Sequence, residues 1–280
     1  MKGLARLFGG SALFRRPTVP EGYRVYAIGD IHGRDDLLEE LLAAIEADCC
    51  RRGPAKLVLV FLGDLIDRGA SSKDVVERLR TYRPAGARIV FLAGNHEEVL
   101  LRIIDGETRL VPDWLRFGGA ECLRSYGADP EPLRKMAPEQ AIGVIRSAIP
   151  AAHVEFLRSF DDTFRAGDYL FVHAGIRPGI PLAEQAPSDL RWIREPFLTD
   201  GAEHGFLVVH GHTIREGVDE RVNRIGIDTG AYRYGILTAV ALEGTERWYL
   251  QTSADQANFM DLSGNRANSS ALDAVSSQSG

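Results

Sequence analysis

The sequence predicts an α/β fold in which a parallel β-sheet is flanked by helices. Short apolar runs beginning near residues 23, 56 and 87 each precede a segment with helical periodicity. The runs are continuously apolar rather than alternating, which is typical of parallel strands buried on both faces. Their spacing is also about that of a βαβ unit, roughly 30 residues. The predicted strand–helix pairs are 23–29 with 35–50, 56–63 with 72–82, and 87–94 with 97–104.

The remaining chain changes character twice. Residues 106–160 have helical periodicity interrupted by prolines, with no strand candidate, and predict a helical insertion. Further strands are then expected, separated by turns and by one helix-poor loop from Gly175 to Asp200. These strand candidates are 164–173, 206–212, 221–230, 234–242 and 247–251. The predicted domain covers residues 21–252, between a flexible basic arm (1–20) and a disordered tail (253–280) rich in Ser, Ala, Asn and Gly.

The composition excludes several classes of protein. Hydrophobic residues make up 45% and charged residues 26% of the chain, and no apolar run approaches the ~18 residues of a membrane span. The net charge of −6 argues against nucleic acid as a partner. Three cysteines, two of them adjacent, fit neither a disulfide framework nor a CxxC zinc site, so a cytoplasmic protein is expected. Nothing in the sequence indicates an oligomeric state.

Five predicted strands end in a glycine motif that contains residues able to bind metal. Functional residues of open α/β sheets gather at the carboxyl ends of strands, where these motifs lie. Five of the seven histidines occur in them, and a set of unrelated core histidines does not explain that coincidence. The motifs are GDIHG (29–33), GDLIDRG (63–69), GNHE (94–97), VHAG (172–175) and HGHT (210–213).

The spacing of these residues predicts two adjacent cation sites. Asp30 and His32 are two residues apart, so in extended chain their side chains point the same way and can bind one cation. Asp64 follows another strand, and its two oxygens can bridge two cations. The second cation would be bound by one amide and two imidazoles, from Asn95, His173 and His212. Mixed nitrogen and oxygen ligands suit divalent transition metals, with Mn expected first and Fe, Zn or Ni as alternatives. Two such cations ~3.5–4 Å apart are typical of phosphoryl-transfer sites.

In this order, GDIHG, GDLIDRG, GNHE, HAG and GHT resemble the motifs of the calcineurin-like metallophosphoesterases. More narrowly, they resemble the phosphoprotein phosphatase family, in the bacterial and phage branch typified by the lambda phage phosphatase. The resemblance extends from about Tyr23 to Leu250. It implies a two-sheet β-sandwich flanked by helices, with the helical insertion, and the same division of ligands between two metals. Ile214 replaces a further histidine ligand of the wider superfamily, as in the phosphoprotein phosphatases, and His210 matches no ligand.

Further residues are expected to act on the substrate. His96 follows Asn95 directly, so its side chain points elsewhere, and an imidazole there can protonate the leaving group. By resemblance, Asp67 orients His96, while Asn95 and Arg68 bind the phosphate. Arg194 lies in WIRE, which resembles a WNRE segment that supplies another phosphate contact, although the asparagine of that segment is isoleucine here.

The resemblance predicts a bacterial serine/threonine-type protein phosphatase, which hydrolyses phosphorylated protein or small phosphoesters by direct attack of metal-activated hydroxide. The alternative is a symmetrical diadenosine tetraphosphate hydrolase on the same scaffold. Those relatives tend to carry GDLVARG, GNHD and GHW, so Asp67, Glu97 and Thr213 favour the protein phosphatase. A catalytically inactive adaptor is disfavoured because every expected ligand is present. A nuclease is disfavoured because the chain has no basic stripe.

The helical insertion, from Gly106 to Phe160, is expected to select the substrate. It leaves the chain between the third and fourth motifs, and should therefore fold back over the edge of the cleft. Its residues Trp114, Arg116 and Phe117 could contact the part of a substrate beyond the phosphate. The alternative is that they only pack the insertion against the core, which is the favoured interpretation for Trp114.

Overall fold

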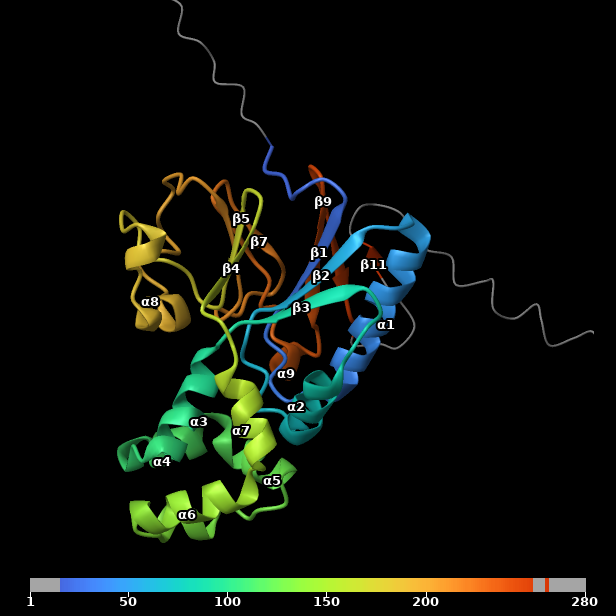
Figure 1. Cartoon of the computed structure of the whole chain (residues 1–280). Coiled ribbons are helices and arrows are strands. Elements are labelled where there is room, and N and C mark those ends of the chain that lie inside the picture. Colours follow the sequence, from blue (N-terminus) through green and yellow to red (C-terminus); the bar gives the residue numbers. More distant parts are fainter. Residues whose placement is uncertain (1–15, 254–259, 262–280) are drawn as a thin grey trace, which may run out of the picture.

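A computed structural model describes residues 16–253 and 260–261 of the chain. Two β-sheets face each other, and a block of helices lies at one end of them (Figure 1). The first sheet has the strand order β11-β10-β9-β1-β2-β3. Strands β1 to β3 are parallel, and β9, β10 and β11 extend the sheet in antiparallel pairs. These strands are β1 (Tyr23–Ile28), β2 (Lys56–Phe61), β3 (Ala87–Phe91), β9 (Thr238–Glu243), β10 (Glu246–Gln251) and β11 (Met260–Asp261).

The second sheet has the order β4-β5-β6-β8-β7. Its central strands β5, β6 and β8 are parallel, and each edge strand is antiparallel to its neighbour. The strands are β4 (Thr163–Ala166), β5 (Tyr169–Val172), β6 (Leu207–His210), β7 (Asp219–Glu220) and β8 (Arg224–Gly226). The expected two-sheet sandwich with flanking helices is confirmed. The two-residue strands β7 and β11 were not foreseen, because two residues carry no periodicity.

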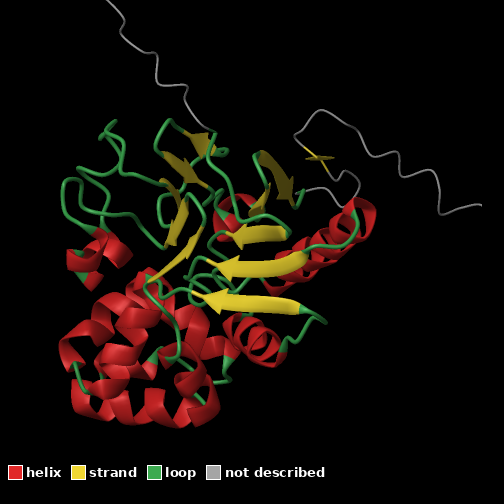
Figure 2. Ribbon diagram, turned by 45° about the horizontal axis from the view of Figure 1, so that its top comes forward, coloured by secondary structure: helices red, strands yellow, loops and turns green. Residues whose placement is uncertain are grey.

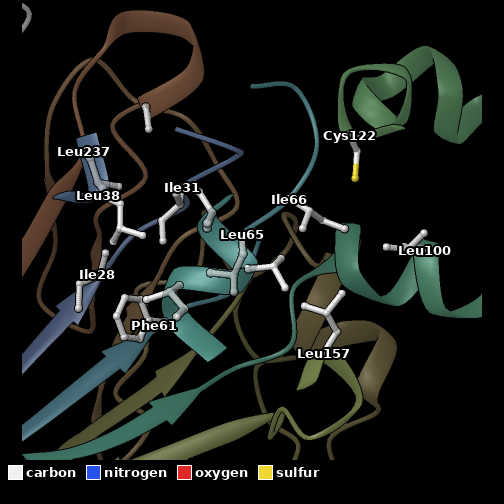
Figure 3. Close-up of a cluster of buried hydrophobic side chains, with 14 of the residues drawn as sticks. Ile28, Ile31, Leu38, Phe61, Leu65, Ile66, Leu100, Cys122, Leu157 and Leu237 are labelled. Carbon is white, nitrogen blue, oxygen red and sulfur yellow. The ribbon is translucent and has the colours of Figure 1, made fainter. Parts of the chain in front are cut away.

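Apolar side chains fill the space between the sheets and also cover their outer faces. Val25 and Val60 of the first sheet belong to the same buried cluster as Phe171 and Val209 of the second. The alternate residues of the first sheet, such as Ile28 and Phe61, point to the helical side, where Figure 3 shows them among Leu38, Leu65 and Leu237. Both faces of β1 and β2 are therefore buried, which explains why their sequences are continuously apolar.

Three helices follow the three parallel strands of the first sheet, as the sequence predicts. They are α1 (Asp35–Arg52), α2 (Ser72–Thr81) and α3 (Asn95–Asp105). Each connection from strand to helix is short and contains one of the glycine motifs or its first residue. The amino end of every helix therefore lies beside the carboxyl end of the strand that precedes it, and the motif residues are held between them.

The segment between α3 and β4 consists of helices joined by short turns and forms the lower block in Figure 2. Its helices pack on α3 through buried residues that include Leu100, Ile103, Ile142 and Leu157. The path bends at a π-helical turn, Leu115–Gly119, where Phe117 and Gly118 leave helical geometry. The helices are α4 (Val111–Trp114), α5 (Ala120–Ser125), α6 (Pro138–Ala148) and α7 (Ala151–Arg158).

Two short helices complete the fold. Helix α8 (Pro187–Trp192) belongs to the long loop after β5, and this loop covers the outer face of the second sheet with Ile176, Leu190 and Phe197. Helix α9 (Ala231–Tyr234) lies between β8 and β9. Within the described part of the chain, no helix is both long and apolar enough to cross a membrane.

The expected arm and tail fall largely outside the described residues. At the end of the arm, Thr18 donates its backbone N–H to Asp168 and Val19 donates to the carbonyl of Gly244, so this end is tied to the sandwich. In the tail, Met260–Asp261 pairs with β10. The expectations of a flexible arm before residue 16 and of a disordered tail elsewhere concern residues that the structure does not describe.

Candidate active site

The glycine motifs converge at one edge of the sandwich. Asp30, Asp64 and Asn95 follow β1, β2 and β3 of the first sheet, while His173 and His212 follow β5 and β6 of the second. All five side chains are buried. Because the carboxyl ends of both sets of parallel strands face this edge, residues up to 182 positions apart lie within hydrogen-bond distance.

Asp64 lies at the centre of the cluster. One carboxylate oxygen, Oδ2, is 3.5 Å from Nε2 of His32 and 3.5 Å from Nε2 of His173. The other oxygen accepts the backbone N–H of His96 at 3.0 Å. Although burial acts to raise the pKa of Asp64, the surrounding imidazoles hold it well below its usual range. An ionised carboxylate between imidazoles of both sheets has the geometry expected of a bridging ligand.

The four residues predicted for the second cation are brought together. Oδ1 of Asn95 lies 3.0 Å from Nε2 of His173 and 2.9 Å from Nδ1 of His212. Ligand atoms of Asp64, His173 and His212 lie within 4.8 Å of one another. Burial lowers the pKa of both histidines, which favours the neutral imidazole that a metal ligand requires.

The first predicted cation site is built around His32. Its Nδ1–H donates to the carbonyl of Ile66 at 2.8 Å, which fixes the tautomer and leaves Nε2 as the acceptor nitrogen on the side of Asp64. A three-residue group of ligand atoms within 4.8 Å contains His32, Asp64 and His96. Asp30 lies outside that group: its Oδ2 accepts the backbone N–H of His212 at 2.9 Å, and its Oδ1 is buried without a hydrogen-bond partner.

Carboxylates are packed around Asp30 more closely than their own charges favour. Burial, followed by the charges of Asp228 and Asp64, raises the pKa of Asp30 well above its usual range. Burial also raises the pKa of Asp228 to about 6. Gly211 permits this crowding, because a Cβ there would lie 2.0 Å from Oδ1 of Asp30. An excess of buried negative charge beside an unpartnered oxygen is the environment that a divalent cation stabilises.

His96 is held by Asp67, and Asp67 is held in turn by the helical block. Nδ1–H of His96 donates to Oδ2 of Asp67 at 2.7 Å, which leaves Nε2 on the side of Asp64, 3.9 Å from its Oδ2. Burial acts to lower the pKa of His96, but the charges of Asp64 and Asp67 outweigh it and raise the pKa. Nε1–H of Trp114 also donates to Asp67, at 3.0 Å. The sequence did not indicate this contact. For Trp114, the favoured interpretation was that its side chain only packs the insertion against the core.

Glu97 is a second residue whose role the sequence analysis missed. Its fully buried carboxylate accepts the backbone N–H groups of Asp64 and Leu65, each at 2.8 Å, and that of Gly94 at 3.1 Å. The loops after β2 and β3 are therefore joined by one side chain. A glutamate three residues after a helix-capping glycine is a capping-box pattern, and that signal was available in GNHE.

The backbone is strained where the site residues stand. His32, Asp64, Asp67, Arg68 and His212 all have φ between 47° and 71°, the left-handed region that side chains other than glycine avoid. Each such residue costs on the order of 1–3 kcal/mol, and such strain clusters at functional sites. From the sequence, only the glycines of the motifs are expected to adopt the positive φ values of the turns. In the structure, the site residues adopt positive φ values as well.

A cavity of about 710 Å³ opens onto the cluster. Arg68 and Arg194, both expected to bind phosphate, line it together with Asn95 and His96. The guanidinium of Arg68 lies 4.7 Å from the centroid of the Tyr232 ring and 3.2 Å from Nε2 of His32. Arg194 forms no ion pair with any residue that the structure describes. The cavity thus has two guanidinium groups beside the predicted metal ligands.

A buried cluster of imidazoles and carboxylates under a cationic cavity defines the class of metal-dependent phosphoesterases. The calcineurin-like phosphoesterase family model matches residues 23–236, and the chain belongs to that family. Divalent metal ions are implied by this family and by the His/Asp groups of the site.

The chain is also similar in sequence to several curated proteins and in fold to solved structures. A protein of Methylococcus capsulatus named symmetrical bis(5'-nucleosyl)-tetraphosphatase is 32% identical over 55% of this chain and 44% of its own length. One of Dechloromonas aromatica with the same name is 25% identical over 83% of this chain and 97% of its own length. The chain thus spans about half the length of the first of these relatives. A solved structure described as a candidate diadenosine tetraphosphatase has a TM-score of 0.57 at 22% identity, covers 86% of this chain and 100% of its own, and shows the shared fold.

These comparisons correct the predicted branch. The family is confirmed, but the curated relatives carry the name of the tetraphosphatase rather than that of a protein phosphatase, so the serine/threonine phosphatase prediction was wrong. The physical reason lies in the residues used to discriminate. Asp67 holds His96 and Glu97 joins two loops, so both act within the protein, and neither lines the cavity in which a substrate would bind.

Proposed function

We propose that the chain is a symmetrical dinucleoside tetraphosphatase, which hydrolyses diadenosine tetraphosphate or a related compound at the middle of its phosphate chain. The observation that carries this proposal is the name shared by the curated relatives, one of which is matched along 97% of its length. The chemistry of the cavity supports it, because guanidinium groups and predicted metal ligands line it together with apolar side chains.

The residues present fit two divalent cations. Asp30, with its unpartnered oxygen, and His32 would hold the first, and Asp64 would bridge. The second would be held by Asn95, His173 and His212. When bound, such cations activate a water molecule and neutralise phosphate charge. Mn is proposed as the metal, since nitrogen and oxygen ligands without thiolate suit it.

Arg68, Arg194 and Asn95 are proposed to orient the phosphate. Arginine presents a planar fork of N–H donors that matches the oxygens of a phosphate group. The Arg68 guanidinium is placed by the Tyr232 ring on one side, and its backbone N–H donates to the carbonyl of Gly118 at 3.1 Å. A phosphate chain would therefore meet a cation whose position is set from two elements.

His96 is proposed to be the general acid. The attacking water gives one proton to solvent and its oxygen forms a new bond to phosphorus. The bridging P–O bond breaks, and the departing nucleoside diphosphate oxygen takes the proton from Nε2 of His96. Asp67 accepts the Nδ1–H of the same ring and so directs the titrating nitrogen towards Asp64 and the cavity. Solvent then returns the proton to His96.

Analysis of the reaction products tests this proposal. Purified protein supplied with Mn²⁺ is incubated with diadenosine tetraphosphate, and the nucleotides are separated by ion-exchange chromatography. Two ADP molecules per substrate are expected. Formation of ATP with AMP would contradict symmetrical cleavage. Absence of hydrolysis, with a phosphoserine peptide turned over in a parallel reaction, would refute the proposed function.

A further inference from the structure

The cavity beside the predicted metal ligands is lined by two chemically different sets of side chains. The polar set consists of Asp64, Asn95, His96 and His212 with the two arginines. The remaining wall is mostly apolar. It is formed by side chains from α3, from the start of the helical block and from the loops after β5, β6 and β8: Val99, Leu110, Trp114, Phe117, Trp192, Ile214 and Tyr232. Trp114 holds Asp67 and Tyr232 lies against Arg68, whereas Phe117 and Trp192 have no role in the chemistry described above.

Two aromatic rings on this wall are open to solvent. Phe117 is 56% exposed and Trp192 is 40% exposed, and both line the cavity. They come from different parts of the sequence, the helical block and helix α8. Apolar rings that stay exposed to water at the edge of a cavity are energetically unfavourable. They are typical of surfaces that bind a flat apolar ligand.

Trp192 is held in place from its edge. Its Nε1–H donates to Oε2 of Glu98 at 3.2 Å. Glu98 is fixed in turn by Arg102 at 3.0 Å and by Arg191 at 3.4 Å. The indole is thus anchored through its one polar atom while two fifths of the residue stays exposed. A ring ordered before binding loses little conformational entropy when a ligand stacks on it.

Phe117 is tied to the arginine that is proposed to bind phosphate. Its backbone (φ −97°, ψ 16°) leaves helical geometry just before Gly118, whose φ is 126°. The carbonyl of Gly118 accepts the N–H of Arg68, and a Cβ on Gly118 would lie 2.6 Å from that nitrogen. The backbone next to Phe117 is therefore held against the backbone of Arg68. The guanidinium of Arg116 lies 5.4 Å from the centroid of the same ring.

We propose that Phe117 and Trp192 form a nucleobase-binding site, which stacks one of the two bases of a dinucleoside tetraphosphate. This inference rests on the proposed function and adds the residues that recognise the nucleoside. The charges favour one orientation: Arg68 and Arg194 attract the phosphates, and the base then stacks on Phe117 and Trp192. Because the substrate is symmetrical, either half can bind in this way.

Kinetics with alanine variants test the site. Removal of a stacking ring weakens base binding by roughly 5- to 150-fold. Phe117→Ala and Trp192→Ala should each raise KM for diadenosine tetraphosphate within that range, while leaving the inhibition constant of inorganic tetraphosphate, which has no base, unchanged. Trp192→Phe should restore KM. Ile180→Ala, which removes an apolar side chain of similar exposure (41%) outside the cavity, is the matched control and should behave as wild type.

Tryptophan fluorescence gives a readout independent of activity. Trp114 and Trp248 are each 3% exposed, so Trp192 is the tryptophan open to solvent. ADP should quench the emission of the wild-type protein, pyrophosphate should not, and in Trp192→Phe the quench should shrink to the contribution of Trp114, which also lines the cavity. Unchanged KM in both alanine variants, or a quench of wild-type size in Trp192→Phe, would overturn base binding. By contrast, absence of diadenosine tetraphosphate hydrolysis by the wild type would overturn the proposed function, so the two failures are distinguishable.

Discussion

Individual residues of the site are held against their own backbone preferences. Asp64 and His212 take left-handed φ values of 50° and 63°, and nothing in their chemistry as single residues favours that geometry. They are kept there by hydrogen bonds to the backbone. Asp64 receives the N–H of His96 on its side chain and gives its own N–H to Glu97, while His212 gives its N–H to Asp30. The site is thus preorganised before any ligand binds.

Replacement of His96 separates proton transfer from metal binding. His96→Asn should lower kcat by ~10²–10⁴-fold, the range for loss of a general acid. The loss should lie at the lower end for both diadenosine tetraphosphate and p-nitrophenyl phosphate, because the departing diphosphate and p-nitrophenolate are both weakly basic. Metal content, measured by elemental analysis, should equal that of the wild type. Loss of metal would instead make His96 a ligand, consistent with its position beside His32 and Asp64.

Replacement of Glu97 tests the connection between two loops. Glu97→Gln keeps the shape of the side chain but turns an amide N–H₂ towards backbone N–H donors, so at least two hydrogen bonds are lost. The free energy of unfolding in urea should fall by at least about 2 kcal/mol, since each hydrogen bond to a charged group contributes roughly 1.5–3 kcal/mol. Glu246→Gln, on the surface, should change it by under about 1 kcal/mol. Equal effects in the two variants would contradict the role of Glu97.

At the scale of elements, the sequence predicted the strand–helix units and the ligands at their ends, because both follow from local pattern. Continuous apolar runs located β1, β2 and β3, and the glycine motifs located Asp30, Asp64 and Asn95. The contacts between elements were not predictable in this way. Trp114 of α4 reaches Asp67 only because the chain bends at Leu115–Gly119, and no periodicity marks that π-helical turn.

Helix α1 is joined to the sheet by a polar contact whose strength depends on pH. Burial acts to raise the pKa of Asp48, but hydrogen bonds from Tyr26 and Trp248 and the charge of Arg52 outweigh it and lower the pKa. A lowered pKa contributes stability that is complete above the unfolded value of about 3.9 and is lost as the pH falls through the folded value.

Asp48→Asn should therefore destabilise the protein at pH 7 by about 1–3 kcal/mol, because buried donors lose a charged acceptor. The difference from wild type in urea unfolding should shrink as the pH is lowered below about 4. Asp36→Asn, whose carboxylate pairs with Arg34 at an exposed position, should cost under about 1 kcal/mol at pH 7. A difference between Asp48→Asn and wild type that is constant with pH would show that the charge of Asp48 is not what joins α1 to the sheet.

At the scale of the whole molecule, the site is a junction of the two sheets. The first sheet supplies Asp30, Asp64 and Asn95, the second supplies His173 and His212, and each half is incomplete alone. The motifs could predict this set because their chemistry is shared across the family. They could not predict the substrate, because Phe117 and Trp192, which are proposed to bind the nucleobase, come from segments outside the five motifs.

The central claim is that Asp64 joins two cation sites built from the two sheets, and a titration with Mn²⁺ tests it most directly. Isothermal titration calorimetry of the metal-depleted protein should show two equivalents per chain for the wild type. Asp64→Asn should weaken both sites together, because its carboxylate faces His32 on one side and His173 on the other. One site that keeps wild-type affinity in Asp64→Asn, or a wild-type protein that binds a single equivalent, would contradict the account.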